Sequence, residues 1–201
     1  MTRRAQLELK RVFDFVASAA LLIVLSPLLV VIAAAVRVLT GPPVLYQWNV
    51  VGINGRPFQG YKFRTMVQNA DDLKRELLNR NEMQGPVFKI KEDPRVTPLG
   101  RWLRKFSLDE LPQLWSVLKG DMSLVGPRPP LATEYANFSD AQKRKLSVRP
   151  GMTSLWHVSG KPADFEEWLR LDLEYIERWS LGLDLQILLK TTLVVLAGQN
   201  H

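Results

Sequence analysis

Residues 15–36 read FVASAALLIVLSPLLVVIAAAV, which is 22 consecutive positions without a charged side chain. As an α-helix this stretch would be roughly 33 Å long, at about 1.5 Å per residue, which is enough to cross the hydrocarbon core of a bilayer. Pro27 has no backbone N–H, and its ring clashes with the carbonyl four residues earlier, so the helix must kink or break there. The stretch therefore predicts a membrane-embedded helix that is interrupted at Ser26 and Pro27.

Basic residues flank this apolar stretch on both sides: Arg3, Arg4, Lys10 and Arg11 precede it, and Arg37 follows it. Positive charge favours the cytoplasmic side of a membrane, so both ends of the stretch are drawn to the same face. They can share that face only if the chain enters the bilayer, turns at Ser26-Pro27 and leaves again. The residues themselves leave two arrangements open, a re-entrant hairpin and a kinked span.

The composition of the whole chain is that of a folded protein with a basic surface. Of 201 residues, 46% are hydrophobic and 23% are charged, and the formal net charge is +7. Such an excess suits a polyanionic partner, namely nucleic acid, an anionic membrane surface or a phosphorylated substrate. The absence of cysteine excludes disulfides, thiolate metal sites and cysteine nucleophiles. With only two histidines, a multi-histidine metal site is not expected either.

The pattern divides the chain into a membrane-embedded segment, residues 1–40, which is either a re-entrant hairpin or a kinked span, and a compact catalytic or binding unit, residues 41–201. We expect this second unit to be mixed α/β and dominated by helices. Asn54-Gly55 separates two predicted strands, Val44–Val51 and Arg56–Phe63, which together predict a small β-hairpin.

The remaining segments are mainly helical or irregular. Helices are expected at Asn69–Arg80, Leu99–Phe106, Leu111–Leu118, Ser139–Ser147 and Phe165–Trp179. Gly85–Gly100 contains three prolines and is expected to be a loop with a short strand at Val87–Ile90. Leu185–Leu196 is too short for a span and is interrupted by Lys190, so it fits a buried helix or one lying in the membrane interface.

The stretch RKFSLDELPQLWSVLKGDMSLVGPRPP, residues 104–130, carries most of the candidate chemistry. Asp109 and Glu110 are adjacent acids, and Pro112 is best placed at the first position of a helix. The two carboxylates would then stand just ahead of that helix and face a cleft. A positive helix end and nearby basic residues would keep both ionised. An ionised carboxylate can act as a nucleophile or as a Mg²⁺ ligand.

Rigid arginines predict a basic pocket near these acids. Arg128 lies within Gly126–Pro130, and Arg149 precedes Pro150 and Gly151. A fixed guanidinium suits phosphate recognition, and Lys62 and Arg64 add to the positive charge. Neither of the common glycine-rich phosphate-binding motifs is present. Asp172 lies in a predicted helix, where the residues alone do not separate a functional role from a solvated helical face.

In these motifs the chain resembles the bacterial sugar transferase family, the monotopic phosphoglycosyl transferases. It is most similar to the catalytic domain of polyprenyl-phosphate sugar transferases, which begin exopolysaccharide or O-antigen synthesis. The resemblance runs from about Leu9 to Leu196. It includes LSPLL, NGRPF, YKFRTM, the stretch DPRVTPLGRWLRKFSLDELPQLWSVLKGDMSLVGPRPP, RPGMTSLW and LDLEYIERWSL.

The resemblance implies a reaction at the cytoplasmic face of the bacterial inner membrane. A nucleotide diphosphate sugar, usually a UDP-sugar, gives its sugar-1-phosphate to undecaprenyl phosphate and releases UMP. The family works in two steps through a covalent phosphosugar–aspartate, with Mg²⁺. By motif, Asp109 would be the nucleophile and Glu110 its partner carboxylate at the metal. Substrate contacts would come from Lys62, Arg64, Arg104, Arg128, Arg149 and Asp172, and Ser26-Pro27 would form the re-entrant turn of a monotopic protein.

Some positions depart from the family pattern. Trp48, Asn49 and Val50 stand where relatives usually carry a Gln and an Arg before Gly52, and His157 stands where Gln is frequent. Because these positions lie near the expected sugar pocket, the sequence does not identify the sugar. It also leaves open whether the protein forms a homodimer, and whether the chain is a short form or a fragment of a longer protein. The competing hypothesis is a catalytically silent, membrane-attached protein that binds anionic lipids or a partner. Nothing beyond net charge supports a nucleic-acid partner.

Overall fold

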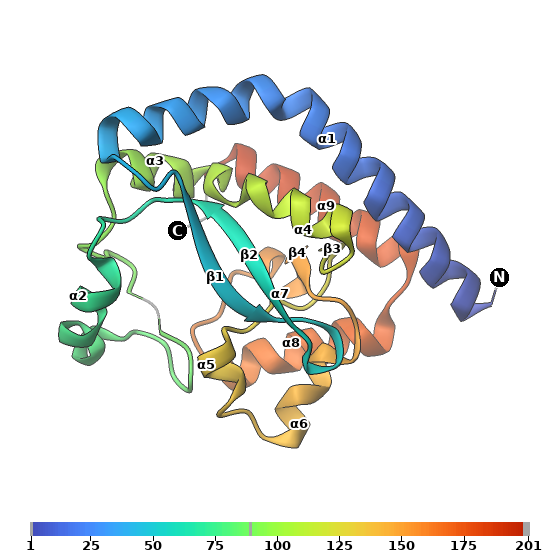
Figure 1. The fold of residues 1–201 in the computed structure, drawn as a ribbon. Coiled ribbons are helices and arrows are strands. Elements are labelled where there is room, and N and C mark those ends of the chain that lie inside the picture. Colours follow the sequence, from blue (N-terminus) through green and yellow to red (C-terminus); the bar gives the residue numbers. More distant parts are fainter. Residues whose placement is uncertain (1, 89, 199–201) are drawn as a thin grey trace.

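Helix α1 (Arg3–Thr40) is a single 38-residue α-helix that arches over one side of the molecule (Figure 1). The structure is a computed structural model and describes residues 2–88 and 90–198. Within that part of the chain, α1 is the helix whose length and composition suit a membrane crossing, and most of its apolar surface is exposed.

The predicted break at Ser26 and Pro27 is wrong, because the helix continues through both residues. Pro27 leaves the carbonyl of Ile23 without its usual N–H partner. The Ser26 hydroxyl donates to that same carbonyl at 2.8 Å and so replaces the missing hydrogen bond. The helix therefore stays continuous through the proline and forms an arch (Figure 1).

The β-hairpin follows α1 as predicted. Strands β1 (Leu45–Val51) and β2 (Pro57–Phe63) are antiparallel, with Leu45 opposite Phe63. The turn between them includes the short 3₁₀ helix η1 (Ile53–Gly55), in which Asn54 and Gly55 have φ values of 55° and 79°. These left-handed conformations are the ones that Asn and Gly tolerate best, which is why this dipeptide marks the turn.

The other helices are short except for the last two. The α-helices are α2 (Ala70–Glu76), α3 (Pro98–Lys105), α4 (Leu114–Lys119), α5 (Ala132–Tyr135), α6 (Asp140–Lys143), α7 (Leu155–Val158), α8 (Phe165–Arg178) and α9 (Leu181–Leu196). The 3₁₀ helices are η2 (Leu78–Arg80), η3 (Leu108–Gln113) and η4 (Arg144–Ser147). A parallel pair, β3 (Ser123–Val125) and β4 (Gly151–Thr153), completes the mixed, helix-dominated fold.

Four of the predicted segments differ in detail. The helix expected at Asn69–Arg80 is divided into α2 and η2. The helix expected at Leu111–Leu118 is divided into η3 and α4, so Pro112 lies inside a 3₁₀ helix rather than at the first position of an α-helix. The helix expected at Ser139–Ser147 is likewise α6 followed by η4. No strand forms at Val87, Phe88 or Ile90, while Lys89 lies outside the described residues.

The helices and the hairpin are stacked below α1, with their apolar faces turned toward a shared core. In Figure 1, α3, α4 and α9 lie beneath the arch of α1, and the hairpin and α5–α8 lie further from it. Val117, Val125 and Ile187 form part of the core between these layers. On its other face α9 exposes four leucines: Leu185, Leu189, Leu193 and Leu196. An apolar exposed face beside a buried one agrees with the helix expected to be buried or interfacial.

Candidate active site

The acid pair lies in η3, directly after a sharp left-handed residue. Ser107, with φ of 50°, ends the connection from α3, and Asp109 and Glu110 follow within the 3₁₀ helix. Asp109 is buried, with 6% of its surface exposed. Glu110 forms an ion pair with Lys62 of β2. The hairpin therefore delivers a cation to the acid pair, a contact between residues 48 positions apart that no local pattern in the sequence specifies.

The two carboxylates have opposite pKa shifts. Burial and then the charge of Glu110 raise the pKa of Asp109 to about 6, against the opposing influence of Lys62 and Arg104. Burial also opposes ionisation of Glu110, but Lys62 and Arg128 outweigh it and lower its pKa to about 2. Both groups are therefore mainly ionised at neutral pH.

Arg104 reaches the acid pair because α3 packs directly on the end of β2. A Cβ at Gly100 would lie 2.0 Å from the Thr65 carbonyl oxygen, so only glycine permits this approach. One turn later, Arg104 donates from Nε to the Thr65 hydroxyl at 2.9 Å. From there its positive charge opposes the rise in the pKa of Asp109 that burial and Glu110 cause.

A small cavity of about 10 Å³ brings together Lys62, Glu110, Arg128 and His157. Its remaining lining residues are Trp48, Gln113, Pro129, Gly151 and Met152. The Lys62 Nζ atom also lies 4.1 Å from the centroid of the Trp48 ring. Since the cavity is about the size of one water molecule, a larger ligand could enter only if these side chains moved apart.

His157 is a residue of this pocket whose chemistry the sequence did not indicate. Burial and then the charge of Arg128 lower the pKa of His157 to about 3, so the ring is neutral. The Ser154 hydroxyl lies 2.8 Å from Nδ1 and also accepts from the His157 backbone N–H. The Ser154 hydroxyl can donate to Nδ1 or accept from it, so this contact holds the ring in place with either tautomer. The one feature of the sequence that pointed to His157 is its departure from the family pattern at that position.

The two arginine motifs meet through their backbones but not through their side chains. The N–H of Gly126 donates to the Thr153 carbonyl at 2.9 Å, and the N–H of Gly151 donates to the Pro127 carbonyl at 2.9 Å. Arg128 then lines the Glu110 cavity, whereas Arg149 is exposed, donates to the Gly120 carbonyl at 3.0 Å and lines a different cavity. The expectation that both arginines share one pocket is therefore wrong in this structure.

Arg64 is also placed away from the acid pair. It is buried and donates to the carbonyls of Thr40 and Pro42 at 2.6 and 2.8 Å, and to that of Gly41. Alternate residues of a strand point to opposite faces, so Lys62 and Arg64 would share one face of a regular strand. Strand β2 ends at Phe63, however, and Arg64 turns toward the end of α1 instead.

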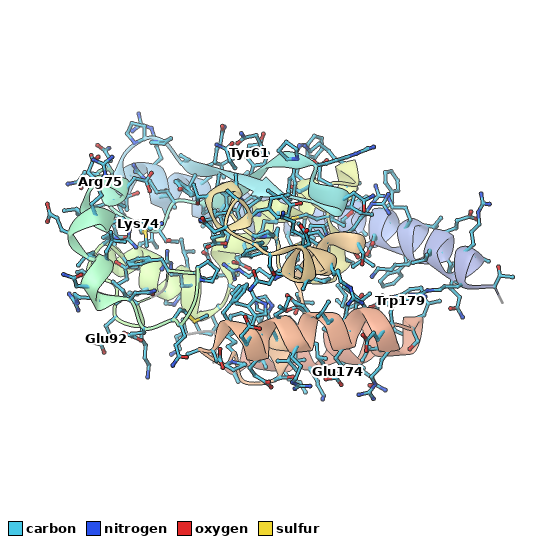
Figure 2. The ribbon with its side chains drawn as sticks, turned by 90° about the horizontal axis from the view of Figure 1, so that it is seen from below. Tyr61, Lys74, Arg75, Glu92, Glu174 and Trp179 are labelled. Carbon is cyan, nitrogen blue, oxygen red and sulfur yellow. The ribbon has the colours of Figure 1, made fainter. Side chains whose placement is uncertain are left out.

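Asp172 lies neither on a solvated face nor in the Glu110 cavity. It is completely buried on α8 and forms an ion pair with Lys145 of η4 at 2.6 Å. The Lys145 Nζ atom lies 4.6 Å from the centroid of the Trp168 ring. The solvated face of α8 carries Glu174, which pairs with Arg170 and Arg178 and is labelled on the outer side of the helix in Figure 2.

The chain belongs to the bacterial sugar transferase family, whose sequence pattern matches residues 5–198. It is 50% identical over 160 residues to a galactosyl transferase, CpsE, of Streptococcus agalactiae, covering 79% of this chain and 36% of that protein. It is 44% identical over 201 residues to an undecaprenyl-phosphate galactose phosphotransferase of Salmonella typhimurium, covering 98% of this chain and 42% of that protein. The exopolysaccharide production protein ExoY of Rhizobium meliloti is 40% identical over 187 residues, which are 90% of this chain and 83% of that protein. The chain thus spans well under half the length of the first two relatives.

Proposed function

We propose that this protein transfers a sugar-1-phosphate from a UDP-sugar to undecaprenyl phosphate, as a membrane step of exopolysaccharide, O-antigen or related glycoconjugate synthesis. The observation that carries the proposal is the acid pair of buried Asp109 and half-buried Glu110, with Lys62, Arg104 and Arg128 arranged around it. An ionised acid beside several cations suits attack on a diphosphate, because the cations offset the negative charge of the substrate. The name of the Salmonella relative supports the lipid acceptor.

In the first step, an Asp109 carboxylate oxygen attacks the sugar-bearing phosphorus of the donor. A P–O bond to Asp109 forms, the P–O bond to the bridging diphosphate oxygen breaks, and UMP leaves with that oxygen. In the second step, a phosphate oxygen of undecaprenyl phosphate attacks the same phosphorus and displaces the Asp109 carboxylate. The product is undecaprenyl-diphosphate sugar, and the enzyme is regenerated.

The acid pair has the donor chemistry for Mg²⁺. Mg²⁺ is usually held by one or two carboxylates together with substrate phosphate oxygens and water. Asp109 and Glu110 would hold it, and the metal would neutralise negative charge on the diphosphate. The described residues contain no cluster of three or more acidic, histidine or cysteine ligands. The substrate would therefore have to complete the coordination.

Membrane association is supported by α1 and by apolar side chains beyond it. Trp102 of α3 and Trp115 of α4 are about half exposed, and α9 carries its exposed leucines. Aromatic residues of this kind favour the membrane–water interface. We infer a monotopic protein on the cytoplasmic face of the inner membrane, with residues 41–201 as the catalytic unit. Residues 1–40 would be a re-entrant segment, in which α1 bends near Ser26-Pro27 without a break in the helix.

The decisive experiment omits the lipid acceptor. Full-length protein in neutral detergent with Mg²⁺ and a panel of UDP-sugars, UDP-galactose first, should release up to one UMP per active site. Its intact mass should rise by one sugar-phosphate, located on Asp109 by peptide mapping. Asp109→Asn should lose both signals because an amide is a poor nucleophile, whereas Asp140→Asn, at an exposed aspartate, should keep both.

Two outcomes would contradict the proposal at different levels. Release of UMP only when undecaprenyl phosphate is present, without an adduct, would indicate direct transfer and overturn the covalent step. No UMP release from any UDP-sugar, with acceptor present, would favour the silent lipid- or partner-binding protein.

A further inference from the structure

A second cavity, of about 310 Å³, lies where the N-terminal half of α1 meets the C-terminal end of α8. None of its lining residues lines the Glu110 cavity. Figure 2 shows Trp179, one of its walls, between α8 and α1. The volume is at the lower end of the range for small-molecule sites. Nothing in the proposed reaction uses this cavity.

The charges that line the cavity are mostly positive: Arg3, Lys10, Arg11 and Arg149, against Asp14. Three of these cations have partners in the fold, and for Arg149 the partner is only the Gly120 carbonyl, which accepts from its Nε atom at 3.0 Å. Lys10 pairs with Asp184 at 2.6 Å, and Arg11 donates to two backbone carbonyls at 2.7 and 2.8 Å. Arg3 and Arg149 form no ion pair within residues 2–88 and 90–198. The cavity therefore retains positive charge for an anion.

Ser123 supplies an independent sign of a missing ligand. Its side chain is 1% exposed, it lines the cavity, and its hydroxyl has no hydrogen-bond partner in the part of the chain that the structure describes. Buried hydroxyl groups are normally paired, because leaving one unpaired costs stability. The oxygen is covered in this structure, so a polar ligand in the cavity would satisfy it once the neighbouring side chains moved slightly apart.

The rest of the wall is apolar and close to the membrane segment. Leu7, Ile176 and Trp179 contribute apolar surface, and the Trp179 ring is fixed by its N–H, which donates to Asp184 at 3.1 Å. Leu7 precedes the charge-free run that starts at Phe15 by about 12 Å along a helix rising about 1.5 Å per residue. That places the cavity near the headgroup layer of the membrane in which α1 would be embedded.

We propose that this cavity binds an anionic phospholipid, with its headgroup phosphate contacting Arg3 and Arg149, Ser123 hydrogen-bonding at the base, and the start of an acyl chain on Leu7 and Trp179. The lipid would join the N-terminal half of α1 to the body of the protein and so fix how the catalytic unit sits on the membrane. The proposal rests on the membrane association proposed above, but not on the reaction.

The test uses delipidated full-length protein in neutral detergent, with bound lipid counted by native mass spectrometry. The probes are short-chain phosphatidylglycerol, short-chain phosphatidylcholine and glycerol phosphate. We expect one phosphatidylglycerol to bind at least about tenfold more tightly than either other probe. Arg3→Glu should weaken that binding about tenfold or more. The matched control is Arg4→Glu, which makes the same charge change one residue later on α1, at an arginine that pairs with Glu8 and does not line the cavity.

Ser123→Ala separates ligand binding from stability. Because the hydroxyl is unpaired in the fold, its removal should keep or raise the melting temperature of the lipid-free protein while weakening phosphatidylglycerol binding. Equal effects of Arg3→Glu and Arg4→Glu would show diffuse surface attraction and overturn the proposal. So would equal binding of phosphatidylcholine, which needs no anion site, or of glycerol phosphate, which needs no acyl chain. UMP release, measured in parallel, reports on the proposed function separately.

Discussion

Removing the cation from the buried Lys145–Asp172 pair should strongly destabilise the fold. Each side chain is 1% exposed, and Nζ lies 2.6 Å from a carboxylate oxygen. Lys145→Met would leave the Asp172 carboxylate buried without its partner, which typically costs about 3–5 kcal/mol. For a chain of this size, roughly 2–4 °C are lost per kcal/mol, so the melting temperature should fall by roughly 6–20 °C.

The assay is thermal unfolding in detergent, followed by intrinsic fluorescence, for both single variants and the double variant. Asp172→Asn should destabilise as well, whereas Lys145→Met combined with Asp172→Leu should recover most of the loss, because an apolar pair of similar volume removes both buried charges. The matched control is Lys143→Met. Its partner Asp140 is fully exposed, so that change should cost less than about 1 kcal/mol.

The Lys145→Met defect should also depend on pH. Burial raises the pKa of Asp172, and Lys145 opposes that rise. Without Lys145 the native carboxyl binds a proton more readily than the unfolded one. The native state of the variant then binds more protons than the unfolded state. Protonation of Asp172 therefore adds to the stability of the variant below the unfolded pKa of about 3.9, and this contribution is lost as pH rises through the folded pKa. The difference in melting temperature between Lys145→Met and the wild type should therefore be smaller at acidic pH than at alkaline pH.

One result would refute this reasoning. Asp172→Asn could keep the wild-type melting temperature but lose UMP release, and the double variant Lys145→Met with Asp172→Leu could be no more stable than Lys145→Met alone. Asp172 would then act in the active site, as the family resemblance implies, and not as a structural partner of Lys145.

Three further predictions concern the metal, the arginines and α1. EDTA should abolish UMP release and Mg²⁺ should restore it, and Glu110→Gln should remain impaired at saturating Mg²⁺; full activity in EDTA would exclude the metal. Arg128→Ala should lower kcat/KM roughly 10- to 150-fold without changing the melting temperature, since a charged hydrogen bond contributes about 1.5–3 kcal/mol. Arg64→Ala should instead lower the melting temperature, because the partners of Arg64 are backbone carbonyls; a loss of kcat/KM with an unchanged melting temperature would indicate that Arg64 contacts the substrate. Cysteines placed at Thr2 and Asp71, in a chain with none of its own, should both react with an impermeant reagent from the cytoplasmic side only; reaction from opposite sides would demonstrate a full span.

What the sequence predicts well here is local. Asn54-Gly55 specifies its hairpin because the turn conformation depends on those two residues alone. The helix predicted to begin at Ser139 does begin there, because Ser139 and Gln142 form a capping box: each backbone N–H donates to the other residue's side chain, at 2.9 Å from Ser139 and 3.3 Å from Gln142. Pro27 shows the limit even of local reasoning, because a neighbouring hydroxyl replaces the hydrogen bond that the proline removes.

What the sequence could not predict is which face a charged side chain turns to after the chain has folded. Asp172 and Glu174 are two residues apart on α8, yet one is fully buried and the other lies on the solvated face. Arg128 and Arg149 belong to loops whose backbones touch, yet they line separate cavities. In each case the outcome depends on a distant partner, such as Lys145 for Asp172.

The same long-range contacts distinguish the two acids of the proposed site. Lys62, brought in by the hairpin, pairs with Glu110 and leaves Asp109 without an ion-pair partner among the described residues. The ammonium of Lys62 neutralises one oxygen of Glu110 and leaves the other for a metal, whereas neither oxygen of Asp109 is in an ion pair among the described residues, so Asp109 can face a phosphorus atom. Nucleophilicity also falls as basicity falls, and the pKa of Glu110, about 2, lies below that of Asp109, about 6. Geometry and basicity thus favour Asp109 as the attacking group and Glu110 as its charged neighbour. A phosphosugar adduct found on Glu110 would show that the ion pair with Lys62 does not determine which acid attacks.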